Sequence, residues 1–192
     1  VYKRQVIDEL IFKIYPKSFF QTNIKQTIKL YELVKGFANL KGNEIVYDLY
    51  SGLGTISQFV AKKAKKVIGI ESIGEAVISA KESAKSNKIY NVEFELGDMK
   101  NIFTSKFISK HGNPDVIITD PPRDGMHKDV IKEILKLETK KIVYVSCNPS
   151  TQCRDLELLK EKYDIEKVQP IDMFPHTDHV ENIVLLKLKC KL

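Results

Sequence analysis

Two side chains in this sequence, a cysteine and a glutamate, have the types and settings that covalent chemistry requires. Cys147 follows the apolar run 142–145 and precedes Asn148 and Pro149. Asn is a common helix cap and Pro favours the first helical position, so Cys147 is expected where a strand is followed by a helix. The positive end of that helix is expected to lower the pKa of the thiol from about 8.5 and so raise the thiolate fraction. The alternative for a single cysteine is a small buried hydrophobic residue.

Glu181 is the second such residue. Its neighbours Val180 and Ile183 are apolar, which is unusual around a surface glutamate. A carboxylate in such a setting can act as a base if it shares a crevice with the thiol. The elements around Cys147 and Glu181 must therefore bring the two together.

The apolar pattern predicts strands that alternate with helices along most of the chain. Strands are expected at 10–15, 45–50, 67–71, 91–96, 115–119 and 141–146, and helices at 24–40, 55–64, 74–87, 99–108, 127–138 and 150–162. Parallel strands joined by helical crossovers are typical of this order, so the predicted fold class is α/β with a doubly wound sheet. Two last strands, 163–171 and 182–189, have no helix between them and are expected to pair antiparallel.

Composition limits the other possibilities. The chain has 192 residues, of which 43% are hydrophobic and 29% charged, as in an ordinary soluble domain. No apolar stretch approaches the roughly 18 residues of a membrane span. The net charge of +6 is compatible with a nucleic-acid partner, and the three cysteines match no metal-ligand spacing. We expect a cytoplasmic monomer that has no metal site and no contact with a membrane.

The polar residues at the strand ends point to a binding crevice. Ligands of open α/β sheets bind outside the carboxyl ends of the strands. The expected strands are followed there by a glycine turn with Gly52, and by Glu71, Asp98, Asp120 and Cys147, and the antiparallel last strand begins near Glu181. Each of these alone could be a tight turn, a solvated strand end or a helix cap. Six converging loops favour a shared ligand site.

The cofactor follows from the types of these residues. A nicotinamide dehydrogenase needs a third glycine where this chain has Ser57. Methyltransferases that use S-adenosylmethionine share the glycine turn and the ribose carboxylate, here Glu71. They add an acidic residue after the third strand, here Asp98, and a polar Asp-Pro-Pro or Asn-Pro-Pro after the fourth, here 120–122. The sequence therefore favours S-adenosylmethionine.

The target atom follows from the residue after the two prolines. Methyltransferases that act on exocyclic amines typically carry an aromatic residue there, and this chain has Arg123. Carbon 5 of a pyrimidine is a poor nucleophile until a thiolate adds to carbon 6. A base must afterwards remove the proton from carbon 5. Cys147 and Glu181 would supply this pair.

These residues carry a resemblance to a known family. The segments 18–23, 48–54, 120–125, 144–151 with 154–156, and 172–181 match, in order, motifs of the RNA uracil-5-methyltransferase family. The match runs from about residue 16 to the end of the chain and implies a Rossmann-like methyltransferase fold. It implies transfer of a methyl group from S-adenosylmethionine to carbon 5 of a uridine in ribosomal or transfer RNA.

The resemblance also implies roles for individual residues. Cys147 would be the nucleophile and Glu181 the base, and Arg123 and Phe19 would lie on the substrate side. The residues implied to bind the methyl donor are Gln21, Tyr50, Gly52, Thr55, Glu71, Asp98 and Asp120. Thr55 stands where some members have Asn, and Ser51 where the family usually has Cys. His176 and His179 flank the Glu181 loop, in a supporting role or as exposed loop residues.

The length of the chain differs from that of full family members. These carry an N-terminal RNA-binding barrel and a small inserted domain, in which some hold an iron–sulfur cluster. No four-cysteine set exists in this chain, so such a cluster is expected only in a missing N-terminal region. We expect residues 1–15 to be the tail of that region and 16–192 to be the catalytic domain.

Two alternatives stay open. A cytosine carbon-5 enzyme would usually carry a second cysteine in the Asp120 loop, and this chain has none there. A non-catalytic RNA-binding remnant would not need an intact Cys147, Glu181 and glycine turn. Which uridine in which RNA is modified does not follow from the sequence.

Overall fold

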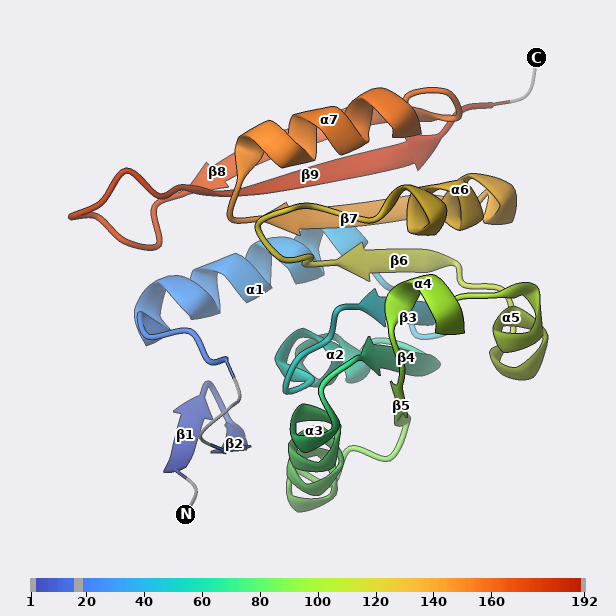
Figure 1. Ribbon diagram of the computed structural model, residues 1–192. Helices are drawn as coiled ribbons and strands as arrows, with labels where there is room; N and C mark the ends of the chain where they lie inside the picture. The colour runs from blue at the N-terminus through green and yellow to red at the C-terminus, as the bar shows by residue number, and fades with distance from the viewer. Residues whose placement is uncertain (1–2, 16–18, 191–192) are drawn as a thin grey trace.

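The computed structural model describes residues 3–15 and 19–190, and a seven-stranded sheet forms its centre (Figure 1). The chain runs through β1 (Lys3–Ile7), β2 (Leu10–Ile14), α1 (Ile24–Ala38), β3 (Ile45–Leu49), α2 (Thr55–Ala61), β4 (Lys66–Glu71), α3 (Gly74–Ser86) and β5 (Val92–Leu96). It continues through α4 (Met99–Ile102), α5 (Ser105–His111), β6 (Val116–Thr119), α6 (Lys128–Leu137), β7 (Lys141–Ser146), α7 (Pro149–Leu159), β8 (Tyr163–Ile171) and β9 (Glu181–Leu188). The α/β class expected from the sequence is confirmed.

The strand order explains where a ligand can bind. The sheet has the order β5-β4-β3-β6-β7-β9-β8, and the five strands from β5 to β7 run parallel. β9 pairs antiparallel with both β7 and β8, as expected for the two last strands. The order reverses between β3 and β6, and an open α/β sheet leaves a crevice at such a switch point.

Helices cover both faces of the sheet. Leu30 and Val34 of α1 and Phe59 of α2 pack with Val143 of β7 in one core layer. Ile131 and Ile134 of α6 and Phe107 of α5 belong to a second layer, which contains Tyr144 of β7. Consecutive residues 142–145 of β7 are fully buried because the two faces of this strand meet different helices.

One predicted helix is wrong in extent. The sequence predicts a single helix over 99–108, whereas the structure has α4 and α5 with a break at Phe103 and Thr104. Thr104 is extended, with φ −125° and ψ 166°, and its side chain accepts a hydrogen bond from the amide of Phe107. A threonine cap therefore starts a new helix where the apolar period appeared continuous.

Residues 3–14 form a hairpin that packs on this domain. β1 and β2 pair antiparallel, and Ile7, Leu10 and Phe12 are buried in the core layer that contains α1. The side-chain amide of Asn87, just after α3, both donates to the carbonyl of Ile11 and accepts from its amide. The expectation that 1–15 derives from a preceding region stays a prediction, and its residues 1–2 lie outside the described part of the chain.

Among residues 3–15 and 19–190, no helix is long and apolar enough to cross a membrane.

Candidate active site

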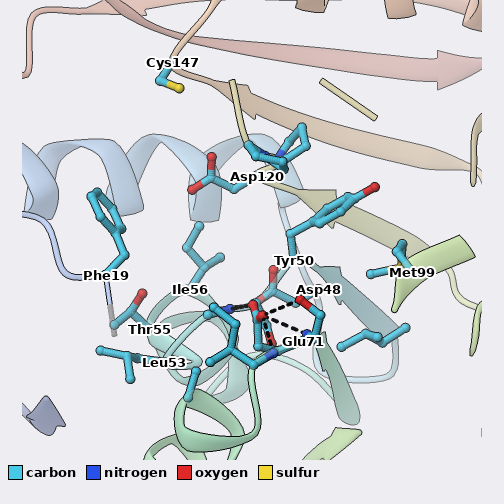
Figure 2. Close-up of a pocket in the computed structure, with 18 of the residues that line it drawn as sticks. Phe19, Asp48, Tyr50, Leu53, Thr55, Ile56, Glu71, Met99, Asp120 and Cys147 are labelled. Atoms are coloured by element: carbon cyan, nitrogen blue, oxygen red, sulfur yellow. Dashed lines mark hydrogen bonds between the residues drawn. The ribbon is translucent and has the colours of Figure 1, made fainter. Parts of the chain in front are cut away.

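A pocket of about 800 Å³ opens at the carboxyl ends of the parallel strands. All the site residues expected from the sequence line it: Phe19, Gln21, Tyr50, Gly52, Thr55, Glu71, Asp98, Asp120, Arg123, Cys147 and Glu181. They come from loops far apart in the chain. In the view of Figure 2, Asp120 lies between Cys147 and Glu71, the last residue of β4.

The glycine turn after β3 is held by the carboxylate at the end of β4. The amide of Gly52 donates to Oε2 of Glu71 at 2.9 Å, and the amides of Ser72 and Ile73 donate to Oε1 at 2.7 and 2.9 Å. Gly54 has φ +68°, and a Cβ there would lie 2.3 Å from the ring of Phe94. Glycine is thus required at Gly54, both for its backbone conformation and for close packing.

Three more of the residues expected to bind the methyl donor are described by their hydrogen bonds. Asp98 caps α4 by accepting from the amide of Lys100 and also lines the pocket, so its cap and pocket positions coexist. The hydroxyls of Thr55 and Tyr31 lie 2.8 Å apart and form a hydrogen bond. Oε1 of Gln21 is buried and has no hydrogen-bond partner among the residues that the structure describes. A ligand that carries N–H groups would satisfy this oxygen.

Three acidic side chains in the pocket have raised pKa values. Burial raises the pKa of Asp48 to about 7, against the effect of a hydrogen bond from Ser57. Burial also raises the pKa of Glu181 to about 7. The pKa of Asp120 is raised well above its usual value, first by burial and then by the charges of Glu181 and Asp48. A cation bound here would be attracted to all three.

The helix after Cys147 begins as predicted, but the pKa of the thiol is not lowered. Asn148 caps α7 by accepting from the amide of Ser150, and Pro149 is in the first turn. The pKa of Cys147 is nevertheless raised, chiefly because the thiol is partly buried and then because Glu181 and Asp120 are negative. Arg123 acts in the opposite direction. The expectation of a lowered pKa is therefore wrong for the protein without ligands, since burial and two carboxylates outweigh the helix end.

The residues expected on the substrate side lie at the exposed parts of the pocket wall. Phe19 has 76% of its surface exposed. Arg123 is exposed as well and follows Pro122 in the loop after β6. His179 lines the pocket, but His176 does not belong to the lining.

Sequence reasoning missed two functional candidates. The sequence points to Asp48 only as the first residue of the segment 48–54, although an acidic residue within an otherwise apolar strand is a usable signal. Asp155 is a fully buried carboxylate on α7 beside the Cys147 loop. The signal for Asp155 in the sequence is an aspartate on the inward face of a predicted helix, directly after Arg154.

The fold and the site together define a Rossmann-like methyltransferase: a doubly wound sheet with an antiparallel end, and a glycine turn and acidic side chains at the switch point. The sequence model of the tRNA (uracil-5-)-methyltransferase family matches residues 3–189, and the chain belongs to this family.

Individual relatives agree with this assignment. An uncharacterized RNA methyltransferase of Bacteroides thetaiotaomicron is 58% identical over 183 residues, which cover 95% of this chain and 40% of that protein. A protein of the same description from Porphyromonas gingivalis is 54% identical over 187 residues, with 96% and 40% covered. This chain thus spans about 40% of the length of these curated relatives.

A solved structure agrees in fold. The crystal structure of Pyrococcus abyssi tRNA (uracil-54, C5)-methyltransferase in complex with S-adenosyl-L-homocysteine superposes with a TM-score of 0.84 at 35% identity. The superposition covers 96% of this chain and 44% of that chain.

Proposed function

We propose that this chain is the catalytic domain of an enzyme that methylates carbon 5 of a uridine in transfer or ribosomal RNA, with S-adenosylmethionine as the methyl donor. The observation that carries the proposal is the position of Cys147 and Glu181 in one pocket with the glycine turn and Asp120. A thiol and a carboxyl of raised pKa at a donor site are the two groups that carbon-5 chemistry needs.

The residues in the pocket fit the donor. The carboxylate of Glu71 lies at the end of β4, where ribose hydroxyls are bound in such folds. The unpartnered Oε1 of Gln21 can accept from an ammonium group, and Asp48 and Asp120 offer negative charge. S-adenosylmethionine, when bound, supplies a methyl group on a positively charged sulfonium.

Cys147 begins the reaction by forming a bond from its sulfur to carbon 6 of the uracil ring. The electron pair of the ring double bond then becomes available at carbon 5, which takes the methyl group. The bond between the methyl group and the sulfonium sulfur breaks, and its electron pair stays on that sulfur, which leaves as a neutral thioether. The ionised Glu181 removes the proton from carbon 5. The double bond re-forms, the bond between sulfur and carbon 6 breaks, and the thiolate of Cys147 is released.

Charge balance in the pocket explains how a thiol of raised pKa can react. In the protein without ligands, Glu181 and Asp120 disfavour the thiolate. A sulfonium cation bound near Cys147 would offset their charge and so favour the thiolate. We therefore expect the bound donor to raise the thiolate fraction of Cys147 near neutral pH.

The test uses the full-length protein with RNA from cells that lack it. Cys147→Ala should abolish methylation and leave the affinity for S-adenosylmethionine, measured by calorimetry, nearly unchanged. Mass spectrometry of the modified nucleosides identifies 5-methyluridine or 5-methylcytidine, and fractionation separates tRNA from rRNA. Turnover in the variant would contradict the nucleophile, and 5-methylcytidine as the product would contradict the target base.

A further inference from the structure

The loop after β6 and the start of α7 are joined by a buried hydrogen-bond network centred on Asp155. Both oxygens of this fully buried carboxylate are used. Oδ2 accepts from the hydroxyl of Tyr144 at 2.6 Å and from the amide of Met126 at 2.7 Å. Oδ1 accepts from Nε and Nη2 of Arg154 at 3.0 and 2.8 Å, and Nη2 also donates to the carbonyl of Asp124 at 2.7 Å. Asp155 thereby ties the far end of the loop to α7.

A second set of bonds fixes the near end of the same loop at Arg123. The carbonyl of Arg123 accepts from Oγ1 of Thr151 at 2.9 Å and from Nδ2 of Asn148 at 3.1 Å. Gly125 lies between the two sets, and a Cβ there would be 2.6 Å from Nη2 of Arg154 and from Oδ2 of Asp155. The backbone from the carbonyl of Arg123 to the amide of Met126 is therefore tied to the helix that follows Cys147.

The charge of Arg123 favours the thiolate form of Cys147. Three charged groups act on the Cys147 thiol: Glu181 at the start of β9, Asp120 at the end of β6, and Arg123 in the loop after it. The two carboxylates disfavour the thiolate, and Arg123 is the cation among the three that favours it. Arg123 and Cys147 line the same pocket, and Asn148, the residue after Cys147, donates to the carbonyl of Arg123.

We propose that Asp155 and Thr151 are positioning residues, which hold the Arg123 guanidinium at Cys147 by fixing the loop 123–126 to α7. This inference rests on the proposed function, in which Cys147 is the nucleophile. Neither residue belongs to the lining of the pocket, so they act through Arg123 and not by contact with a substrate.

The test measures the reactivity of the thiol directly and needs no RNA. Iodoacetamide alkylates the thiolate, so the rate of Cys147 modification across pH reports its ionisation. Full-length protein with Cys153→Ser is used throughout, because Cys147 and Cys153 would otherwise share one tryptic peptide; Cys153 is exposed and free. Mass spectrometry then follows the single remaining thiol of that peptide.

Arg123→Gln, Thr151→Val and Asp155→Asn should each move the midpoint of the alkylation profile to higher pH. Thr151→Ser keeps the hydroxyl and should retain the parental profile. In the double variant Arg123→Gln/Thr151→Val, the shift should equal that of Arg123→Gln alone, because Thr151 acts through Arg123. Methylation assays should show a loss mainly in kcat, with a smaller change in KM for RNA.

Thr151 is half-exposed on α7, so Thr151→Val tests the inference even if Asp155→Asn does not fold. An unchanged alkylation profile in folded Thr151→Val would overturn the inference. So would a double variant whose midpoint shift equals the sum of the two single shifts. If the variants show the expected shifts in the alkylation midpoint but the parental protein methylates no RNA, the positioning role stands and the proposed function fails.

Discussion

The carboxyl group of Glu181 acts on that of Asp120, and both carboxyl groups act on one thiol. The charge of Glu181 raises the pKa of Asp120, and both carboxylates raise the pKa of Cys147. Asp120 comes from the loop after β6 and Glu181 from the start of β9, the strand that runs antiparallel to its neighbour β7. Because β9 runs antiparallel to β7, its first residue, Glu181, lies at the same edge of the sheet as Cys147. The first residue of a parallel strand would lie at the opposite edge.

The methylation rate should rise with pH. In the proposed mechanism Cys147 and Glu181 both act in their deprotonated forms, and the pKa of each is raised, that of Glu181 to about 7. Values of kcat/KM should therefore increase from pH 6 to pH 9, because this parameter reports the ionisation of the protein before its substrates bind. A rate that is flat over this range would contradict the raised pKa values.

Folding stability of the protein without ligands should fall as pH rises from about 4.5 to about 7. Asp48 and Glu181 each have a pKa of about 7 when folded, and their usual values are 3.8 and 4.5. Between these limits the folded state binds protons that the unfolded state has lost, so the derivative of the unfolding free energy with pH is negative. Urea denaturation at several pH values measures this slope.

Variants at Asp48 test the origin of that slope. Asp48→Asn should make it shallower, by at most about 1.4 kcal/mol per pH unit for one proton. Ser57→Ala removes a hydrogen bond that lowers the pKa of Asp48, so the fall in stability should extend to higher pH. An identical slope in Asp48→Asn and the parent would show that Asp48 does not bind this proton.

Gly54→Ala should destabilise the fold by about 2 kcal/mol or more, because a left-handed φ of +68° is combined with a clash against Phe94. Gly36 is the control: it is exposed in α1, and a Cβ there meets nothing within 4 Å. Gly36→Ala should stabilise by about 0.5 to 1 kcal/mol through helix propensity. Chemical denaturation of the two variants compares the effects, and equal stability would contradict the packing described for Gly54.

Much of the fold follows from local patterns. The apolar runs 142–145 and 67–70 predicted β7 and β4 because buried parallel strands are continuously hydrophobic. The polar residues at the strand ends predicted a shared crevice, since parallel strands present their carboxyl ends on one edge. The break at Thr104 was missed, because a polar cap inside an apolar period gives a weak signal.

The electrostatics of the site could not be obtained in the same way. A helix start beside Cys147 suggested a lowered pKa, but the thiol also feels burial, Glu181 and Asp120. Those effects depend on distances between loops that are remote in sequence. The network around Asp155 could not be predicted from local sequence either, because its donors Met126 and Tyr144 lie outside α7.

The most direct test of the account is a search for the covalent adduct in Glu181→Gln. A glutamine cannot take the proton from carbon 5, so the methylated base should stay bonded to Cys147. Full-length Glu181→Gln is incubated with S-adenosylmethionine and unmethylated RNA, digested with nuclease and protease, and analysed by mass spectrometry. If Cys147 is the nucleophile and Glu181 the base, Glu181→Gln yields a Cys147 peptide that carries a methylated uridine nucleotide, and Cys147→Ala yields no such adduct. An unmodified Cys147 peptide, together with normal turnover, would contradict these roles.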